Sequence, residues 1–515
     1  MSNTRWQEDE SLDTLSRQND SKELYNPTAS TSTLVESKMD IKATEMVLSS
    51  SSSVDSSSEE KTALPQKKGI GSTRWLRHKA FILYRKFFSV IVLINVALAC
   101  YILWAWQRYS QNRFVIANIA TAAASNLTAT VLVRSEPVIN AIFAVFCSVP
   151  TSWPLAIRRR CARVFHIGGI HSGCAIATML WFTVFTVIVS LELTKPSDVR
   201  ANLELNNSSD VRAISLATAV LTYFIWPILF TICATSHPQF RHKHHDIWEM
   251  THRFGGWTAL ALLWAQSFVA AKDLALETPL HLAFAQSPSI WLLSITTAAI
   301  IFPWLHLRRV PVLRSEFLSS HAVRLWFDYT TPVVGTTVRL AFQPLRDWHG
   351  FATITNANNQ SGYSLIVSNV GDFTKRAIHT GPEYIYIRGI PTCGVLCITP
   401  LFKSVVLVAT GSGIGPCLAI ILAKRVPYRI MWVAPNPEVT FGKELVKSVL
   451  DHDPHAIIHN TRTQGKPDMS LMAWKLYKES GAEAVCVISN KMLTQQVVYG
   501  LESRGIPAYG AIFDS

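Results

Sequence analysis

The sequence predicts an α-helical transmembrane bundle of about six helices, followed by cytosolic domains that comprise an antiparallel β-barrel and an α/β domain. Hydrophobic residues make up 49% of the 515 residues and charged residues only 16%, which is more apolar than the usual soluble balance. The first half contains apolar runs long enough to cross a bilayer. The second half changes to alternating patterns typical of strands, and then to strand, helix, strand.

Residues 1–65 form the first segment and are rich in Ser, Thr, Asp and Glu, including "SSSSSVDSSSEE" (Ser49 to Glu60). This composition cannot bury enough apolar surface to offset its chain entropy, so we predict a disordered tail. Its polar, acidic start is unlike a cleavable signal peptide. Its serines make phosphorylation one hypothesis, and a solvated leader without a regulatory role is the other.

Residues 80–310 form the predicted transmembrane domain. The first apolar run is "FFSVIVLINVALACYILWAW" (Phe87 to Trp106), and roughly 20 apolar residues are what a helix needs to cross a bilayer. Five further runs lie near 114–133, 164–191, 213–235, 252–272 and 289–306. Six crossings would return the chain to the side on which it began.

The charges orient this bundle. A basic stretch, Lys67 to Lys86, precedes the first run, and the basic residues of the alternate loops fall on the same predicted side. The 192–212 loop instead carries acids and the sequon "NNSS" at Asn206, which we predict to be glycosylated. The positive-inside rule therefore places both termini in the cytoplasm. The short stretch 137–149 is expected at the inner interface, with an additional crossing as the alternative.

The net charge of +13 does not indicate a nucleic-acid partner, because the basic residues flank apolar runs without a recognition motif. Membrane lipid is the expected partner. The nine cysteines follow no disulfide framework, and Cys393 and Cys397 lack partners at a zinc spacing. The histidines of "HPQFRHKHH" (His237 to His245) are expected in a solvated basic loop, and no metal site is predicted.

Two cytosolic domains are expected after the bundle. Residues 317–400 contain short alternating segments, such as "HAVRLWFDY" and "GTTVRLAFQPL", separated by Gly and Asn turns, which predicts a small antiparallel barrel. Residues 404–515 read "SVVLVATG", "IGPCLAIILAKRV" and "YRIMWVAP" in succession. Alternating strands and helices of this kind predict a parallel sheet.

A glycine cluster lies where the first strand of the α/β domain turns into a helix. Gly411, Gly413 and Gly415 would let backbone amides approach a phosphate at the helix N-terminus, and Pro416 suits the first helical turn. The cluster departs from the G-x-G-x-x-G dinucleotide fingerprint, because "IGP" follows "GSG". A tight turn without a ligand is the alternative interpretation.

Four motifs in this order carry a family resemblance: "RDWHGFATI" (Arg346 to Ile354), "NVGDFTKRAI" (Asn369 to Ile378), "ATGSGIGPCL" (Ala409 to Leu418) and "ESRGIPAYGAIFDS" (Glu502 to Ser515). With the six apolar runs, they make residues 80–515 resemble the ferric reductase and NADPH oxidase superfamily, and most closely its fungal TmpA-like membrane flavoproteins. The resemblance implies flavodoxin-reductase-like cytosolic domains that bind FAD and NADPH or NADH.

The resemblance also implies FAD-binding residues. His349 and Phe351 match the His and the aromatic of the superfamily's His-Pro-Phe-Ser/Thr motif, whose Pro and hydroxyl are missing here. Gly371, Thr374 and Lys375 match a second element, whose amides and cation would neutralise the FAD pyrophosphate. A hairpin end with a solvated lysine is the alternative for these three.

The family's nicotinamide-nucleotide loop maps onto Gly411, Gly413, Gly415 and Pro416. Its Cys-Gly-Pro element, which normally lies beside the nicotinamide, is replaced by "ISN" (Ile488 to Asn490). Phe513 matches an aromatic that often covers the flavin, and a C-terminal core residue is the alternative.

The bundle departs further from the family, whose members hold two haems through histidine pairs about 13 or 14 residues apart on each of two helices. Thirteen residues beyond His166 and His252 lie Met179 and Ala265, and His171 also lacks a second histidine at this spacing. We therefore expect no two-haem electron path. One haem at the inner ends, held by His166 and His252, is the alternative.

Two functions of different class follow. The first is a membrane-bound oxidoreductase that takes hydride from NAD(P)H into FAD and passes electrons to an unknown acceptor. The second is a non-catalytic membrane sensor or scaffold that retains a nucleotide-binding fold, in keeping with the link between TmpA-like proteins and fungal conidiation signalling. The resemblance further implies the plasma membrane. "WVAPNP" (Trp432 to Pro437) shows no basic residue that selects NADPH over NADH.

Overall fold

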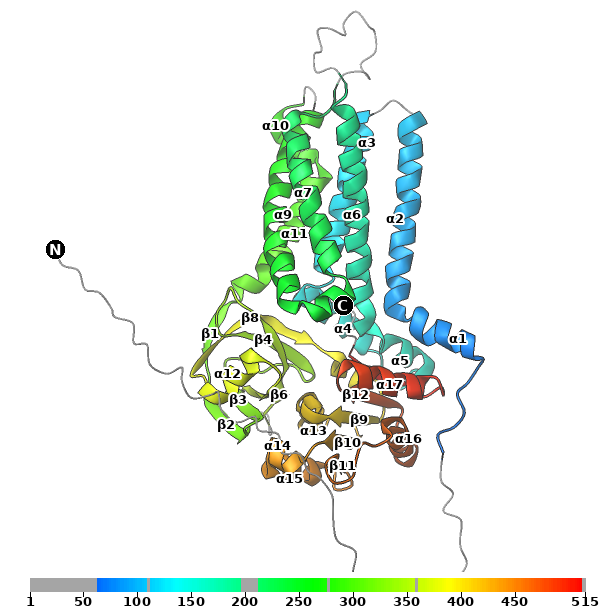
Figure 1. The fold of residues 1–515 in the computed structure, drawn as a ribbon, viewed down its shortest axis with the longest axis vertical. Helices are drawn as coiled ribbons and strands as arrows, with labels where there is room; N and C mark the ends of the chain where they lie inside the picture. Colours follow the sequence, from blue (N-terminus) through cyan, green and yellow to red (C-terminus); the bar gives the residue numbers. More distant parts are fainter. Residues whose placement is uncertain (1–62, 109–111, 196–211, 276–277, 357–359, 512–515) are drawn as a thin grey trace, which may run out of the picture. The chain divides into compact units, whose positions relative to one another are not determined.

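The computed structural model describes residues 63–108, 112–195, 212–275, 278–356 and 360–511 (Figure 1). The predicted tail up to residue 62, the predicted glycosylation site Asn206 and the predicted flavin-covering Phe513 lie outside the described residues. Those three expectations stay predictions.

Within the described parts of the chain, six helices are long and apolar enough to cross a membrane, judged by length and composition. They match the six runs of the sequence. They are α2 (Leu83–Arg108), α3 (Asn112–Leu132), α6 (Gly168–Glu192), α7 (Leu216–Thr235), α9 (His245–Leu274) and α11 (Pro288–Leu305).

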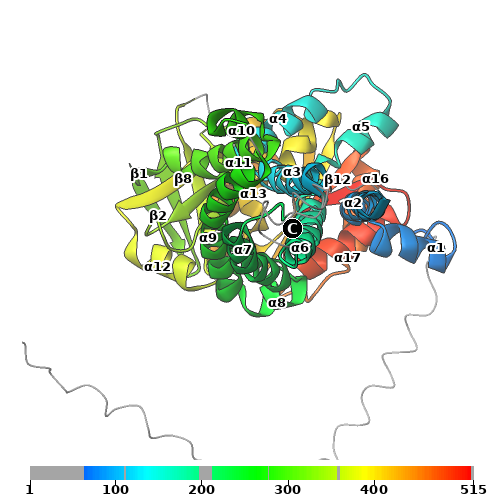
Figure 2. The same ribbon diagram turned by 90° about the horizontal axis from the view of Figure 1, so that it is seen from above.

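Contacts among α3, α6, α7, α9 and α11 close into a ring, and Figure 2 shows these helices from above. The contacts run from α11 to α3, α6, α7 and α9, and α2 packs against α6 from outside. A Cβ atom at Gly169 would collide with the Tyr84 carbonyl oxygen, so glycine permits this close approach. Asn95 Oδ1 joins three helices by accepting from Trp181 Nε1 at 2.8 Å and Asn126 Nδ2 at 2.9 Å.

Short helices connect these elements: α1 (Gly71–Trp75), the π-helical turn η1 (Leu76–Ala80), α4 (Glu136–Cys147), α5 (Leu155–Cys161), the 3₁₀ turn η2 (Val164–Ile167), α8 (Pro238–Lys243) and α10 (Leu280–Gln286). Helix α4 contains most of the stretch 137–149 and packs against strand β8 (Tyr384–Cys393). The Asn140 side chain donates to the Pro391 carbonyl and accepts from the Cys393 amide, each at 2.9 Å. This apolar helix is therefore bound to the antiparallel sheets.

The antiparallel strands form two four-stranded sheets, with orders β1-β8-β4-β5 and β2-β3-β7-β6. A shared apolar core, which includes Leu325, Leu340 and Ile385, packs between them. The remaining elements are β1 (Arg308–Pro311), β2 (Arg314–Ser319), β3 (Ala322–Phe327), β4 (Thr336–Ala341), β5 (His349–Ala352), β6 (Ile354–Thr355), β7 (Tyr363–Ser368), α12 (Asp372–Thr380) and the turn η6 (Val395–Leu401). The first strand begins at Arg308, ahead of the predicted boundary at 317.

The C-terminal part is a five-stranded parallel sheet with the order β11-β10-β9-β12-β13. Alternate side chains of β9 enter different cores, with Leu407 on one face and Val408 on the other. The elements are β9 (Val405–Thr410), the turn η7 (Gly411–Gly413), α13 (Ile414–Ala423), β10 (Tyr428–Ala434), α14 (Pro437–Phe441), α15 (Lys443–His452), β11 (Ile457–Asn460), α16 (Met469–Ser480), β12 (Ala484–Ile488), α17 (Lys491–Glu502) and β13 (Ala508–Gly510).

Candidate nucleotide and flavin site

The parallel sheet has its topological switch point between β9 and β12. Chain order runs outward from β9 in one direction through β10 and β11, and in the other through β12 and β13. Ligands of open α/β sheets bind outside the carboxyl ends of the strands at such a point. The predicted glycine loop leaves β9 here and "ISN" leaves β12 here, and the hydroxyls of Thr410 and Ser489 lie 2.6 Å apart. The structure thus brings both sequence elements together.

The glycines of this loop have different structural roles. Gly411 has a φ of +50°, and its carbonyl accepts from Trp432 Nε1 at 3.0 Å. A Cβ atom at Gly413 would collide with the Ile488 carbonyl oxygen, so only glycine lets the loop lie against β12. A Cβ at Gly415 would make an ordinary 3.6 Å contact with Ile366 of β7.

Helix α13 directs its N-terminus toward this crevice. Pro416 lies in its first turn, where a missing N–H leaves no helical hydrogen bond unmade. The amides of this turn and the helix dipole favour an anion. Because α13 also packs against β5 and β6, its start lies next to the antiparallel sheets that carry the predicted flavin residues.

An aromatic cluster joins the two predicted flavin elements. The Phe373 ring of α12 lies 4.4 Å from the His349 ring and 6.0 Å from the Phe351 ring, measured between centroids. Phe342 lies 4.9 Å from Phe373 on another side. Phe373 was missed by the sequence reasoning, although it is the one aromatic residue in "GDFTKRAI".

A carboxylate holds the ring of His349. Nε2 of His349 donates to Asp347 Oδ2 at 2.6 Å. Burial raises the pKa of Asp347, but the hydrogen bond from His349 and nearby positive charge outweigh it, so the pKa lies below its usual value. Asp347 therefore remains ionised at neutral pH and fixes the orientation of the imidazole.

At the start of α12, a side chain accepts hydrogen bonds from backbone amides of the same segment. Thr374 Oγ1 accepts from the amides of Val370 at 2.9 Å and Gly371 at 3.0 Å. These two amides belong to the element that the resemblance assigns to a pyrophosphate, so Thr374 already satisfies part of that donor set. Lys375 is exposed beside them and provides the positive charge.

A basic residue missed by sequence reasoning, Arg462, follows β11 and lies beside the loop that ends the second strand of the sheet, β10. Asn460 Oδ1 accepts from the amides of Asn436 at 2.9 Å and Arg462 at 3.0 Å, so it holds the loops after β10 and β11 together. The Arg462 side chain is exposed, and no ion pair of its guanidinium is found in the described parts of the chain. Only the pairing of β10 with β11 shows that Arg462 lies beside "WVAPNP".

Among the described residues of the bundle, one pair of histidines lies close together, and it combines His252 with a histidine other than His166. The rings of His171 on α6 and His252 on α9 lie 6.4 Å apart between centroids. His171 Nδ1 lies 2.8 Å from the Thr130 carbonyl and donates to it, which leaves Nε2 free for another partner. His166 instead bonds to the Arg163 carbonyl at 3.0 Å. The alternative of one haem held by His166 and His252 stays a prediction, and the ring found beside His252 is that of His171.

This pair meets one requirement of a haem site. Metal–nitrogen bonds of about 2.0–2.1 Å place the centroids of two axial imidazoles about 6 Å apart. Thirteen residues further along each helix lie Val184 and Ala265, which cannot ligate iron. Among the described residues, the two helices thus provide one axial pair where two haems would need two.

These features define the class of protein: a bundle of six apolar helices joined to two antiparallel sheets and a parallel sheet with a glycine-lined crevice at its switch point. A family model for the C-terminal domain of adenylate-forming reductase 03009 matches residues 395–515. Adenylate-forming reductases 03009 and 06235 of Coprinopsis cinerea are each 45% identical to this chain, over 452 and 454 residues. The alignments cover 88% of this chain and 42% of each relative, so the chain spans about two-fifths of their length.

Solved structures match part of this chain at low identity. Phthalate dioxygenase reductase is 17% identical with a TM-score of 0.32, and the match covers 40% of this chain and 69% of that one. Ferredoxin-NADP+ reductase from Plasmodium falciparum is 14% identical with a TM-score of 0.30, and the match covers 39% of this chain and 95% of that one. The strand order and site geometry described above define the fold without these matches.

Proposed function

We propose that this chain is a membrane-bound NAD(P)H-dependent flavin oxidoreductase. One observation carries the proposal. Helix α13, which begins at the glycine loop of the switch point, packs against β5, and β5 carries the His349 ring of the aromatic cluster that includes Phe373 of α12. A nicotinamide nucleotide and a flavin bound to these two elements would be neighbours. Neighbouring, oriented rings are what hydride transfer requires.

The residues of each half have separate tasks. Gly411 and Gly413 and the first turn of α13 would bind the phosphates of the nicotinamide nucleotide. Phe351 and His349 would pack on the flavin, and Lys375 would offset its pyrophosphate charge. When bound, FAD accepts a hydride from the nicotinamide and passes electrons on singly. The hydroxyl of Ser489, which replaces part of the Cys-Gly-Pro element, and that of Thr410 at the end of β9 would line the nicotinamide pocket.

The names of the relatives support the reductase part of this proposal, and the apolar helices support the membrane part. The aligned relatives are named as reductases, and the family model describes the C-terminal domain of one of them. The six apolar helices support a multi-pass membrane protein. Membership of the TmpA-like group of the ferric reductase and NADPH oxidase superfamily, the plasma membrane and cytoplasmic termini belong to the proposal.

The proposal contains no two-haem electron path, so the acceptor receives electrons by another route. One observation favours a second candidate, in which a single iron is held by His171 and His252, because the ring spacing matches two axial imidazoles. A Soret band that disappears in His171→Ala would support this candidate.

The non-catalytic sensor or scaffold is the alternative function. Thr374 occupies two amides of the flavin element, and "ISN" replaces the nicotinamide element, and both observations favour it. Roles in conidiation signalling and glycosylation at Asn206 would belong to this alternative as well as to the enzyme.

Oxidation of NADPH and NADH with a dye acceptor separates the two functions. The wild-type protein in detergent should oxidise at least one nucleotide. The substitution Gly413→Trp should abolish the activity, because even a Cβ atom here collides with the Ile488 carbonyl.

The control is Val439→Trp, which adds the same side chain at a 74% exposed position of α14 in the same domain. It should retain activity. Gly413→Trp protein that elutes as a single species and still oxidises the nucleotide would contradict the proposal, as would an inactive, folded wild-type protein.

A further inference from the structure

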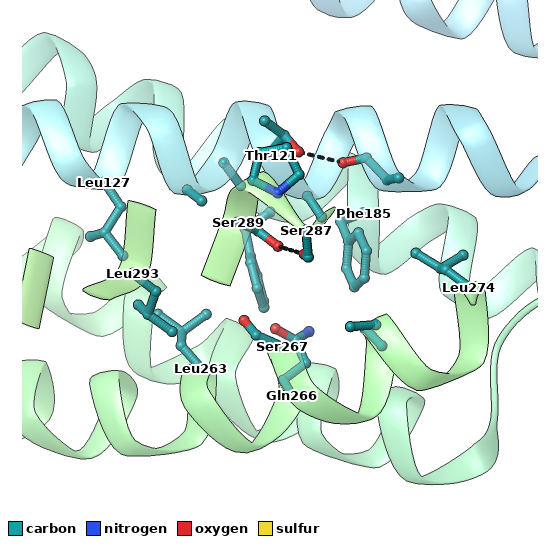
Figure 3. A pocket seen from close by; sticks show the side chains of 18 of the residues that line it. Thr121, Leu127, Phe185, Leu263, Gln266, Ser267, Leu274, Ser287, Ser289 and Leu293 are labelled. Carbon is teal, nitrogen blue, oxygen red and sulfur yellow. Dashed lines mark hydrogen bonds between the residues drawn. The ribbon is translucent and has the colours of Figure 1, made fainter. Parts of the chain in front are cut away.

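The bundle contains a partly open cavity of about 360 Å³ between α3, α6, α9 and the start of α11 (Figure 3). Cavities of this volume and above accept drug-sized ligands. It is separate from the nucleotide and flavin elements, none of whose residues lines it. The cavity is therefore a feature that the proposed reductase function does not use.

Small side chains create this space. Ala117, Ala120 and Ala124 lie at helical spacing on α3, and Ala270 and Ala271 lie across from them on α9. Protein interiors are otherwise packed nearly as densely as organic crystals. An unfilled cavity of this volume forfeits many packing contacts, and an apolar occupant would restore them.

One buried polar side chain faces the cavity with an unused acceptor. Gln266 on α9 is only 5% exposed, and its Nε2 donates to Thr222 Oγ1 at 2.7 Å. Thr222 Oγ1 donates its own hydrogen to the Thr218 carbonyl at 2.7 Å, so it can only accept from Gln266. The amide orientation of Gln266 is thereby set, and Oε1 is the atom left over.

Oε1 of Gln266 has no hydrogen-bond partner within the described residues, and Figure 3 shows the side chain directed into the cavity beside the Ser267 hydroxyl. Ser287 and Ser289, at the opposite wall, bond to each other at 3.0 Å. Because Oε1 can be reached from the cavity and makes no hydrogen bond to the described residues, it is available to accept from an occupant that carries a donor.

The lining also selects the charge of the occupant. Among the described residues that line the cavity, none is Asp, Glu, Lys, Arg or His. A charged group would lose its hydration here without gaining a counter-charge. No lining side chain could ligate a haem iron either, although the cavity lies between α6 and α9.

We propose that this cavity binds an uncharged, largely apolar small molecule with a hydroxyl group that donates to Gln266 Oε1. The alanines of α3 and α9 provide the volume, and Gln266 provides the polar anchor. The ligand bridges helices that otherwise face each other across the cavity. This site is independent of the proposed reductase activity.

The probe for this site is 2-naphthol, and the matched probe without a donor is 2-methoxynaphthalene. Binding is measured as quenching of tryptophan fluorescence of the full chain in lipid nanodiscs, corrected by empty nanodiscs. We expect saturable binding of 2-naphthol, with the ether at least about five-fold weaker, which is the loss of roughly one hydrogen bond. Non-saturable quenching, or equal affinity for both probes, would overturn the proposal.

Two pairs of variants assign the binding to this cavity. Ala270→Phe fills the cavity and should abolish saturable binding, whereas Ala265→Phe places the same ring at an exposed position of α9 and should bind as wild type. Gln266→Leu should remove the preference for 2-naphthol, whereas Gln286→Leu changes another glutamine of the lining, leaves the bond between Gln266 and Thr222 in place, and should retain it. Binding by Ala270→Phe protein as strong as that by wild type would overturn the assignment.

Discussion

At the scale of single residues, a two-pronged ion pair joins α5 to the residue directly before β12 of the parallel sheet. Arg158 donates to both oxygens of Glu483, at 2.6 Å and 2.9 Å, and to the Leu401 carbonyl at 2.8 Å. Arg158 is only 3% exposed. The hydrogen bond from Arg158 lowers the pKa of the Glu483 carboxyl below its usual value.

This pair makes the stability of the protein depend on acid pH. The folded pKa of Glu483 lies below the unfolded value of about 4.3, so its contribution is complete above that value and is lost as pH falls through the folded pKa. Glu483→Gln leaves Arg158 buried without its counter-charge and should cost on the order of 3 kcal/mol at pH 7. We expect the Glu483→Gln protein to have a lower melting temperature than wild type at pH 7. Between about pH 5 and pH 3, where the wild-type carboxylate becomes protonated, its melting temperature should fall by less than that of wild type.

The control for this prediction is Glu479→Gln, which removes an exposed carboxylate of α16 and should melt as wild type. Thermal unfolding in detergent, followed by circular dichroism, gives both quantities. A Glu483→Gln protein with the melting temperature and pH dependence of wild type would show that the pair adds nothing.

The sequence predicts the placement of a residue best where the residue belongs to a contiguous local motif. Gly411 and Gly413 were identified because a strand, three glycines and a helix are contiguous, and the structure places them at the switch point. Phe373 and the pairing of His171 with His252 were missed, because each depends on contacts between segments far apart in the chain. Nothing in the local sequence encodes those distances.

At the scale of elements, hydropathy and periodicity predicted most of what the structure shows. The six apolar runs correspond to six long helices, and the alternation of strands and helices after Ser404 corresponds to a parallel sheet. The strand order could not be predicted, because non-neighbouring strands pair through crossovers. The partner of the apolar stretch 137–149 was also hidden, since its bonds reach β8 some 250 residues later.

The loops after β10 and β11 allow a prediction about nucleotide choice. Arg462 follows β11, which pairs with β10, the neighbour of the strand that ends at the glycine loop, and we expect its exposed cation to contact a 2′-phosphate. Arg462→Ala should therefore raise the KM for NADPH by about ten-fold, the loss of one charge-assisted contact of roughly 1.5–3 kcal/mol. The KM for NADH should change by less than about two-fold, because NADH has no 2′-phosphate.

Lys475→Ala is the control for this substitution, since it removes an exposed cation of α16 away from the crevice. Steady-state oxidation of both nucleotides by the three proteins provides the comparison. Equal changes of KM for NADPH and NADH would show that Arg462 does not read the 2′-phosphate.

At the scale of the whole molecule, the helical bundle and the β-sheets are joined by polar contacts on short helices. Glu136 of α4 accepts from the Ile390 amide at 2.8 Å and from Arg339 at 3.2 Å, and Arg158 of α5 pairs with Glu483. The antiparallel sheets are therefore connected to α4, and the parallel sheet is connected to α5. These contacts connect both sheet systems to the helical bundle through α4 and α5.

The central claim is that the β-sheet domains bind a flavin which a nicotinamide nucleotide reduces. The most direct test is the visible absorbance spectrum of the full chain, purified in mild detergent, before and after addition of NADPH under anaerobic conditions. We expect a flavin absorbance band that bleaches when NADPH is added. A folded, monodisperse protein without a flavin band, or with one that NADPH and NADH both leave unchanged, would contradict it.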